Sequence, residues 1–314
     1  MDPRFEHLRQ LLKHFEARRA RAAARLEAVP GQYSYFAIIG LNAAVEHYEI
    51  GTAEEMPIAI LQRVVEPPGE VELAAALRDT HLMGAIGRYS SGITYELAVD
   101  QSFGSEGQAA NTLAWWVVSA LRVRTLAEIL IPAVADHSWS TIAAVTNNTC
   151  DAQLLEDVPR AHRLEAAREV AEADLDWVVK HVNSFAGLLE KPSFRLATDA
   201  LCTHHHEPNV RMMVAVLWAG IEACFGFNAE LRFRLATTVA ALLERRGEAR
   251  AALYRHVKKL YDVRSQVVHG GDAANENLRE HVKEVRSLLS RLLCSYVEAG
   301  GLPTKGDVEQ AIFG

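Results

Sequence analysis

Hydrophobic residues in the second half of the chain recur every three or four positions, which is the spacing of one face of an α-helix. One such stripe runs from Leu164 to Leu189, and Pro192 is expected to close that helix. Four more helices are predicted, with glycines at the breaks between them: about Asn209–Phe225, Ala229–Arg246, Glu248–Val268 and Asn275–Ala299. Their short connections make successive helices antiparallel neighbours, so we expect an up-and-down bundle.

The first half of the chain has a more irregular pattern, in which glycine and proline separate short apolar segments. Tyr33–Ile39 and Ile93–Val99 are rich in aromatic and β-branched residues, which favour strands. Helices are expected over residues 4–29, 73–82 and 108–130. The predicted fold class is therefore mainly α, with a C-terminal up-and-down helical bundle preceded by a smaller mixed α/β N-terminal region. Turn residues cluster between Thr146 and Arg160, so we expect domains at residues 1–150 and 155–314.

The first predicted helix carries a heptad-like apolar stripe, interrupted by Arg19. Its members are Phe5, Leu8, Leu12, Phe15, Ala22, Leu26 and Val29. Such a stripe packs against another helix, either in its own domain or in a second copy of the chain. The pattern is short, which favours packing within the domain.

The composition is typical of a water-soluble globular protein. The chain starts with a polar segment that is not a signal peptide, and no apolar run approaches the roughly 20 residues that span a bilayer. We therefore expect a cytoplasmic protein with no membrane partner. The four cysteines are scattered without a CxxC pair, which predicts neither a disulfide framework nor a cysteine-based zinc site.

The net charge of −7 does not indicate nucleic-acid binding by the protein as a whole. A local basic segment exists, however: between Arg245 and His269, seven Lys or Arg residues stand against two acidic residues. An isolated run of this kind is usually a solvated helix face. This one coincides with a motif that carries candidate chemistry.

The third bundle helix places a charged residue in line with its apolar face. The residues of that face recur at steps of four and three: Leu253, Val257, Leu260, Arg264 and Val267. A guanidinium is costly to bury without a partner, so Arg264 requires a carboxylate, a neighbouring subunit or a ligand phosphate. Glu222, in the apolar first bundle helix, is the candidate internal partner.

His269 ends the same helix, directly before two glycines. Its position near the negative end of the helix dipole favours the protonated imidazole. In a regular helix, a spacing of five residues separates Arg264 and His269 by about 140°. The two side chains converge only if the helix unwinds at the glycines or two copies of the chain meet, which favours a composite site at a dimer interface.

The segment around these two residues resembles the Apea-like branch of the HEPN family. The resemblance rests on Tyr261-Asp-Val-Arg264-Ser-Gln-Val-Val-His269-Gly270 and on the place of this motif at the end of the third of four helices. The preceding apolar helix with Glu222 adds to it. The resemblance covers roughly Arg211–Leu293, about a quarter of the chain. It implies an all-helical, usually dimeric fold that often acts as a metal-independent endoribonuclease without a cofactor.

On this resemblance, Arg264 and His269 are the catalytic residues. His269 would transfer protons around the ribose 2′-OH, and Arg264 would hold the phosphate and stabilise its transition state. Four residues would support the site: Glu222, Tyr261, Asp262 and Ser265. Three would guide the RNA backbone: Arg255, Lys258 and Lys259. Ser265 is a departure, because many catalytic members have Asn, Asp or His after the arginine, although serine also donates a hydrogen bond.

The resemblance also implies a setting in toxin, abortive-infection or antiphage defence systems. The expected partners are then RNA, a second copy of the chain and an antitoxin or defence-system protein. The alternative function is a non-catalytic HEPN module for RNA binding, sensing or dimerisation. A weaker alternative is a metal-dependent enzyme that uses His204, His205, His206 and Glu207. Because adjacent helical residues point about 100° apart, these imidazoles cannot all face one ion, and no metal site is predicted.

Overall fold

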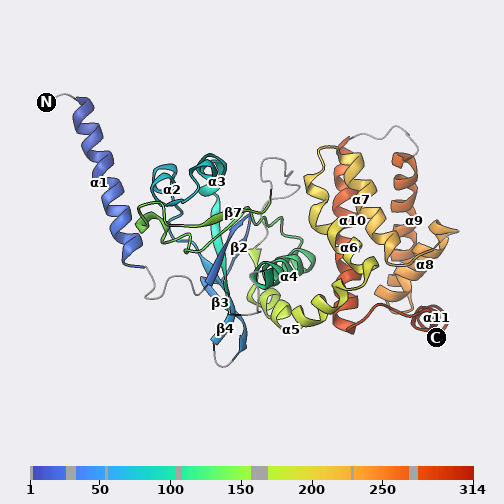
Figure 1. Cartoon of the computed structure of the whole chain (residues 1–314). Helices are drawn as coiled ribbons and strands as arrows, with labels where there is room; N and C mark the ends of the chain where they lie inside the picture. The colour runs from blue at the N-terminus through green and yellow to red at the C-terminus, as the bar shows by residue number, and fades with distance from the viewer. Residues whose placement is uncertain are drawn as a thin grey trace. The chain divides into compact units, whose positions relative to one another are not determined.

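The computed structural model describes residues 3–25, 33–53, 56–102, 108–156, 169–227, 230–268 and 275–314. They form eleven α-helices and a six-stranded antiparallel sheet (Figure 1). The chain divides into two compact units. The first contains the described parts of Met1–Trp115, Ala127–Val158 and Glu169–Glu172, and the second contains Trp116–Leu126 and the described parts of Ala173–Gly314.

The first unit is built on the six-stranded sheet, whose strand order is β3-β4-β5-β1-β6-β7. The strands are β1 (Tyr33–Ile39), β3 (His47–Ala53), β4 (Met56–Arg63), β5 (Ile93–Asp100), β6 (Ala133–Ala135) and β7 (Ala152–Leu154). A separate parallel pair joins β2 (Asn42–Ala43) to β8 (Glu169–Val170). β1 and β5 pair in the centre, with Phe36 opposite Leu97, and almost every residue of both strands is buried.

The two strands predicted from their apolar residues are therefore confirmed, with β5 one residue longer than expected. The other four strands of the sheet were not predicted. β3 contains a glycine and three titratable side chains, and β6 and β7 have three residues each, too few to show an alternating pattern. These three short or polar strands are defined by pairing with their neighbours, whereas β4 is mostly apolar and was missed although its residues favour a strand.

Helices of the first unit are α1 (Pro3–Ala23), α2 (Glu70–Ala76), α3 (Met83–Ser90) and the first part of α4 (Gln108–Thr125). The helix predicted over residues 73–82 is wrong in its length. α2 ends at Ala76 because Leu77 is extended and forms a β-bridge with Cys150. A separate 3₁₀ turn follows at Thr80–Leu82.

The C-terminal part of α1 packs against its own unit. Arg18 donates a hydrogen bond to the Pro67 carbonyl at 2.6 Å and lies 3.1 Å from Glu72, while Arg21 forms an ion pair with Glu66. Ala22 of the predicted stripe is buried, but Leu12 is 55% exposed. The side chains of Phe5 and Leu8 lie outside the described part, as do Leu26 and Val29.

The second unit is helical. It contains α5 (Glu172–Leu189), α6 (Pro192–Thr203), α7 (Val210–Ala223), α8 (Leu231–Leu243), α9 (Glu248–Val268), α10 (Asn275–Ala299) and α11 (Lys305–Phe313). The closest packing joins α6 to α7, α7 to α10 and α8 to α9. The four predicted bundle helices are confirmed to within a few residues. In the described part of the chain, no helix combines the length and apolarity that a bilayer crossing requires.

Two features of this unit differ from the prediction. Pro192 does not only follow one helix: it is the first residue of α6, a position where its fixed φ and missing N–H cost nothing. The second part of α4 also belongs to this unit, which the predicted division at residues 150–155 did not include. Ser290 on α10 donates a hydrogen bond to the Val123 carbonyl, and Arg286 donates one to that of Leu126.

Candidate functional site

Arg264 lies on the buried face of α9, as the spacing of its neighbours predicts. Val257, Leu260 and Val267 of this face are buried, and Leu253 is half-buried. The Arg264 side chain is 20% exposed. The guanidinium therefore reaches the edge of the apolar core but keeps limited contact with water.

Glu222 on α7 is the ion-pair partner of Arg264. The Nη2 atom of Arg264 lies 2.9 Å from Oε1 of Glu222 and donates a hydrogen bond to Oε2 at 3.2 Å. Glu222 is itself largely shielded, and this burial raises the pKa of its carboxyl although Arg264 opposes the shift. The pair links the first and third helices of the predicted bundle.

An aromatic group also lies near the guanidinium. Arg264 lies 5.5 Å from the ring centre of Tyr261, and Tyr261 in turn meets Trp218 edge to face at 5.4 Å. The Trp218 indole donates a hydrogen bond to Nε2 of His281 on α10 at 3.1 Å. Trp218 and His281 were not singled out from the sequence, because both occur within strongly helical segments with nothing to distinguish them from core residues.

One polar atom of Arg264 remains without a hydrogen-bond acceptor among the described residues. Its Nε is buried and makes no such bond, although the Nη2 atom is engaged by Glu222. A buried donor of this kind costs free energy until an acceptor reaches it. The guanidinium therefore has a buried donor that its ion pair does not use.

The other residues predicted to support the site or bind RNA have separate surroundings. Asp262 forms an ion pair with Arg232 on α8, and Arg255 forms an exposed one with Glu248. Lys258 lies over the ring of Tyr254 at 5.1 Å, and Lys259 is exposed. Ser265 is half-buried, and the only predicted catalytic partner, His269, lies outside the described residues.

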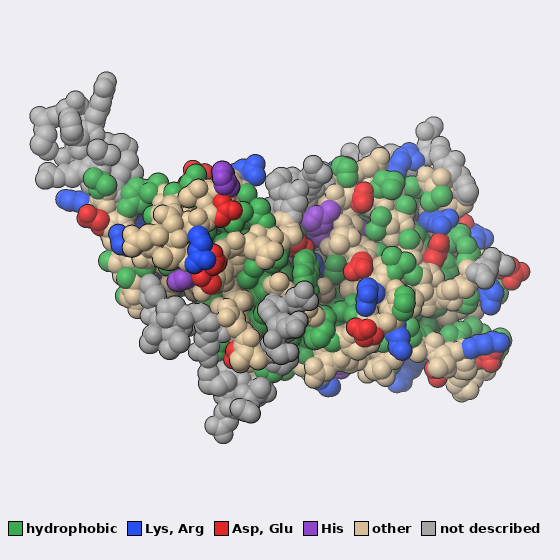
Figure 2. Space-filling model, in the orientation of Figure 1, with side chains coloured by type: hydrophobic (Ala, Val, Ile, Leu, Met, Phe, Trp, Pro, Cys, Tyr) green, Lys and Arg blue, Asp and Glu red, His purple; other side chains and the backbone are tan. Residues whose placement is uncertain are grey.

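Part of the basic segment serves the fold. Arg246 donates a hydrogen bond to the carbonyl of Ile312, and Arg250 donates to carbonyls of Glu244 and Ala311. These arginines tie the ends of α8 and α11 together. On the face that Figure 2 shows, basic side chains of the described residues are interspersed with acidic ones. Fewer positive charges are thus free for RNA than the sequence indicates.

The histidine run adopts a geometry that does not converge on one point. His204, His205 and His206 form a 3₁₀ turn in which the first two are buried. The Nδ1 atom of His204 lies 2.8 Å from the Leu201 carbonyl. Burial lowers the pKa of His204 to about 3 and that of His205 to about 2, so both rings are neutral. They are core residues at the turn between α6 and α7.

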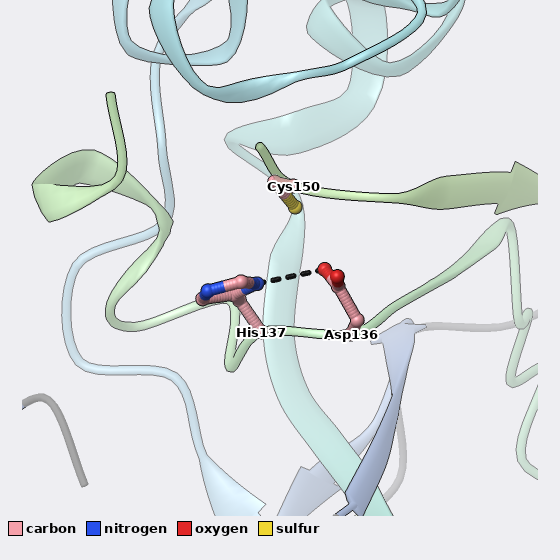
Figure 3. Close-up of side chains that lie close together, drawn as sticks. All are labelled: Asp136, His137 and Cys150. Atoms are coloured by element: carbon pink, nitrogen blue, oxygen red, sulfur yellow. Dashed lines mark hydrogen bonds and ion pairs between the residues drawn. The ribbon is translucent and has the colours of Figure 1, made fainter. Parts of the chain in front are cut away.

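Another group of ligand-type side chains lies in the first unit. Asp136, His137 and Cys150 bring a carboxylate oxygen, a ring nitrogen and a sulfur within 4.8 Å of one another (Figure 3). It is the only group of three or more His, Cys, Asp or Glu among the described residues that meets this spacing. The sequence signal was weak, because the acidic and histidine residues are adjacent while the cysteine follows 13 residues later.

Comparisons with known proteins assign no role to these sites. No family model matches the chain, and no curated protein or solved structure matches it. A HEPN-type function therefore remains a prediction from the resemblance of residues 211–293.

Proposed function

We propose that the chain is a metal-independent endoribonuclease of HEPN type, with Arg264 as its phosphate-binding residue. The observation that carries the proposal is the environment of this guanidinium, which is half-buried and oriented by Glu222 and Tyr261. Its Nε has no acceptor among the described residues. A phosphate oxygen is an acceptor that an arginine binds strongly.

In the proposed reaction, the ribose 2′-oxygen attacks the adjacent phosphorus and the bond from phosphorus to the 5′-oxygen breaks. The proton of the 2′-OH leaves to a base, and the departing 5′-oxygen takes up a proton. His269 from each of two protomers supplies this proton transfer. Arg264 stabilises the charge that develops on the phosphate oxygens. The products are a 2′,3′-cyclic phosphate and a 5′-hydroxyl, and no metal ion takes part.

Glu222 is a positioning residue in this scheme, because it contacts Arg264 and not the RNA. Its carboxylate fixes one edge of the guanidinium while the ring of Tyr261 limits movement of its face. Lys258, Lys259 and Arg255 lie on the same helix and contribute contacts to the RNA backbone. Such contacts add affinity without sequence preference.

The proposal is tested by incubating a mixed RNA pool with purified protein in the presence of EDTA. Wild type is expected to cleave and to leave 2′,3′-cyclic phosphate ends, whereas Arg264→Ala and His269→Ala lower the rate at least about 100-fold. Arg291→Ala is the matched control, since Arg291 also forms an interhelical ion pair, with Glu244, but lies outside the site. Loss of cleavage in the control, or undiminished cleavage by Arg264→Ala, contradicts the assignment.

The alternative is a non-catalytic RNA-binding or dimerisation module. It is favoured by the same ion pair, because Glu222 also gives Arg264 an ordinary structural role across the bundle. This function requires RNA affinity that survives His269→Ala and no cleavage by wild type. Filter binding with the same RNA pool therefore separates the two proposals.

A further inference from the structure

Asp136, His137 and Cys150 lie at the two ends of the long connection between β6 and β7. Asp136 and His137 directly follow β6, and Cys150 shortly precedes β7. Backbone hydrogen bonds hold these ends together: the Asp136 N–H donates to the Asp151 carbonyl at 3.0 Å. The Asp151 N–H donates in return to Oδ1 of Asp136, also at 3.0 Å. Residues far apart in the connection are therefore fixed side by side where the two strands begin to pair.

Both sides of the group are anchored to the rest of the unit. The Cys150 N–H donates to the Ala76 carbonyl at 2.9 Å, and the Cys150 carbonyl accepts from the backbone N–H of Arg78 at 2.8 Å. Directly after His137, Ser138 and the Trp139 N–H both donate to Glu96, a fully buried residue of β5, at 2.6 Å. The backbone that carries all three ligand-type residues is thus held in place before any ion is bound.

The three side chains point toward one another, as Figure 3 shows. Nδ1 of His137 lies 2.7 Å from Oδ1 of Asp136, and Sγ of Cys150 completes the group. Cys150 is fully buried, whereas the side chains of His137 and Asp136 are 16% and 31% exposed. The group therefore has a closed sulfur side and a side that is open to solvent.

We propose that Asp136, His137 and Cys150 bind one zinc ion, with water in a fourth position on the solvent side. Sulfur, imidazole and carboxylate together are a ligand set that zinc accepts, and a thiolate disfavours magnesium and calcium. Ligand atoms at about 2.0–2.3 Å from zinc lie some 3.5 Å apart in a tetrahedron. The three ligand atoms lie within 4.8 Å of one another, so the longer spacings need a small contraction, while the 2.7 Å contact between His137 and Asp136 needs to widen.

Binding changes protonation but not oxidation state. The Cys150 thiol gives its proton to solvent and binds as a thiolate. His137 binds through Nδ1 with a proton on Nε2 only, so the Nδ1 proton that bonds Asp136 in the metal-free protein passes to Nε2 or to solvent. One oxygen of Asp136 then binds zinc in place of its hydrogen bond with His137, while the hydrogen bond from the Asp151 N–H continues to orient the carboxylate.

A nucleophilic role for the cysteine fits the geometry less well. Cys150 has no exposed surface, so a substrate cannot reach its sulfur. Burial and the nearby Asp136 also raise the pKa of the thiol, which disfavours a free thiolate. In the proposed site the cation reaches the sulfur from the side of Asp136 and His137, whose side chains keep some exposed surface.

The test is metal binding by the full-length protein after dialysis against a chelator. Zinc is titrated in competition with a chromophoric chelator, and cobalt(II) is added separately to detect thiolate-to-cobalt charge-transfer absorption. One equivalent of tightly bound zinc is expected. Cys150→Ala and His137→Gln are expected to weaken binding at least about 100-fold and to abolish or diminish the cobalt–sulfur band.

Two controls locate the ion. Cys224→Ala removes a thiol of the second unit, and His206→Ala removes an imidazole of the histidine turn, so neither is expected to change the affinity. His137→Gln keeps a side chain of similar size at a half-buried position, which guards against a simple loss of folding. Stoichiometric zinc binding that is unaffected by Cys150→Ala, or no cobalt–sulfur band in wild type, overturns the proposal.

This site is independent of the proposed ribonuclease activity. Cleavage in EDTA concerns Arg264 and His269, whereas zinc affinity is measured without RNA. Failure of one measurement therefore leaves the other proposal standing.

Discussion

At the scale of single residues, polar groups in and at the edge of the core make stability depend on specific partners. Arg264 and Glu222 each require the other, because removing either leaves a shielded charge without its partner. His281 is equally dependent on its surroundings: it is 4% exposed and accepts the indole hydrogen bond of Trp218 only while its ring nitrogen is unprotonated. Protonation of such groups therefore competes with folding.

The buried histidines predict a loss of stability in mild acid. Burial lowers the pKa of His281 to about 4, and those of His204 and His205 still further. In the unfolded chain these rings bind protons below about pH 6.5, so the unfolded state binds more protons and the free energy of unfolding falls as pH decreases below that value. The contribution of the neutral, buried rings to the free energy of unfolding is fully present above about pH 6.5.

Each such histidine is expected to lower the free energy of unfolding by about 2 kcal/mol when the pH falls from 7 to 5. Urea unfolding at the two pH values measures this difference, and His281→Gln is expected to reduce it by about the same amount. His256→Gln is the control, since His256 on the neighbouring helix is 44% exposed. Equal pH dependence in wild type and His281→Gln would show that His281 does not contribute.

At the scale of elements, the second unit depends on close approach between helices. Gly220 on α7 faces α6 and α10, and a Cβ atom there would lie 2.8 Å from the Cβ of Ala200 and 3.2 Å from Leu289. α7 can approach α6 and α10 this closely only because Gly220 has no side chain. The sequence shows this glycine inside an apolar helix but gives no sign of the neighbours that require it.

Gly220→Val is therefore expected to destabilise the protein by about 1–3 kcal/mol through overpacking. Gly187→Ala on α5 is the matched control, because nothing lies within 4 Å of the added methyl group. It is expected to stabilise by up to about 1 kcal/mol, as alanine is the better helix former. Urea or thermal unfolding of the two variants measures these opposite effects, and stabilisation by Gly220→Val contradicts the packing described here.

At the scale of the whole molecule, the proposed catalytic pair cannot come from one copy of a regular helix. α9 is helical through Val268, and residues five apart on it point about 140° away from each other. His269 lies beyond the described end of α9. If the regular helix continued to it, Arg264 and His269 of one chain would diverge, so we expect the proposed site to combine residues of two chains. The function therefore predicts an assembly.

We expect the protein to form a dimer of two 34.7 kDa chains and to cleave RNA only in that state. Light scattering during size-exclusion chromatography measures the mass, and specific activity across a dilution series relates the mass to cleavage. Activity per chain that stays constant into a concentration range where only monomer is detected would exclude a composite site.

The sequence by itself determined the helices of the bundle and the position of Arg264 on its buried face. Both follow from periodicity along one helix, which depends only on residues a few positions apart. It also indicated Glu222 as the ion-pair partner, since two isolated charges in apolar helices each need compensation. Whether the pair binds RNA stays a prediction.

Only the tertiary structure decided which distant residues meet. It paired the short strands of the sheet, enclosed Trp218 with His281, and gave Gly220 its close neighbours. It also brought Cys150 to Asp136 and His137 by pairing β6 with β7. The physical reason is the same in each case: these contacts depend on backbone pairing and packing between segments far apart in the chain, and local periodicity carries no information about them.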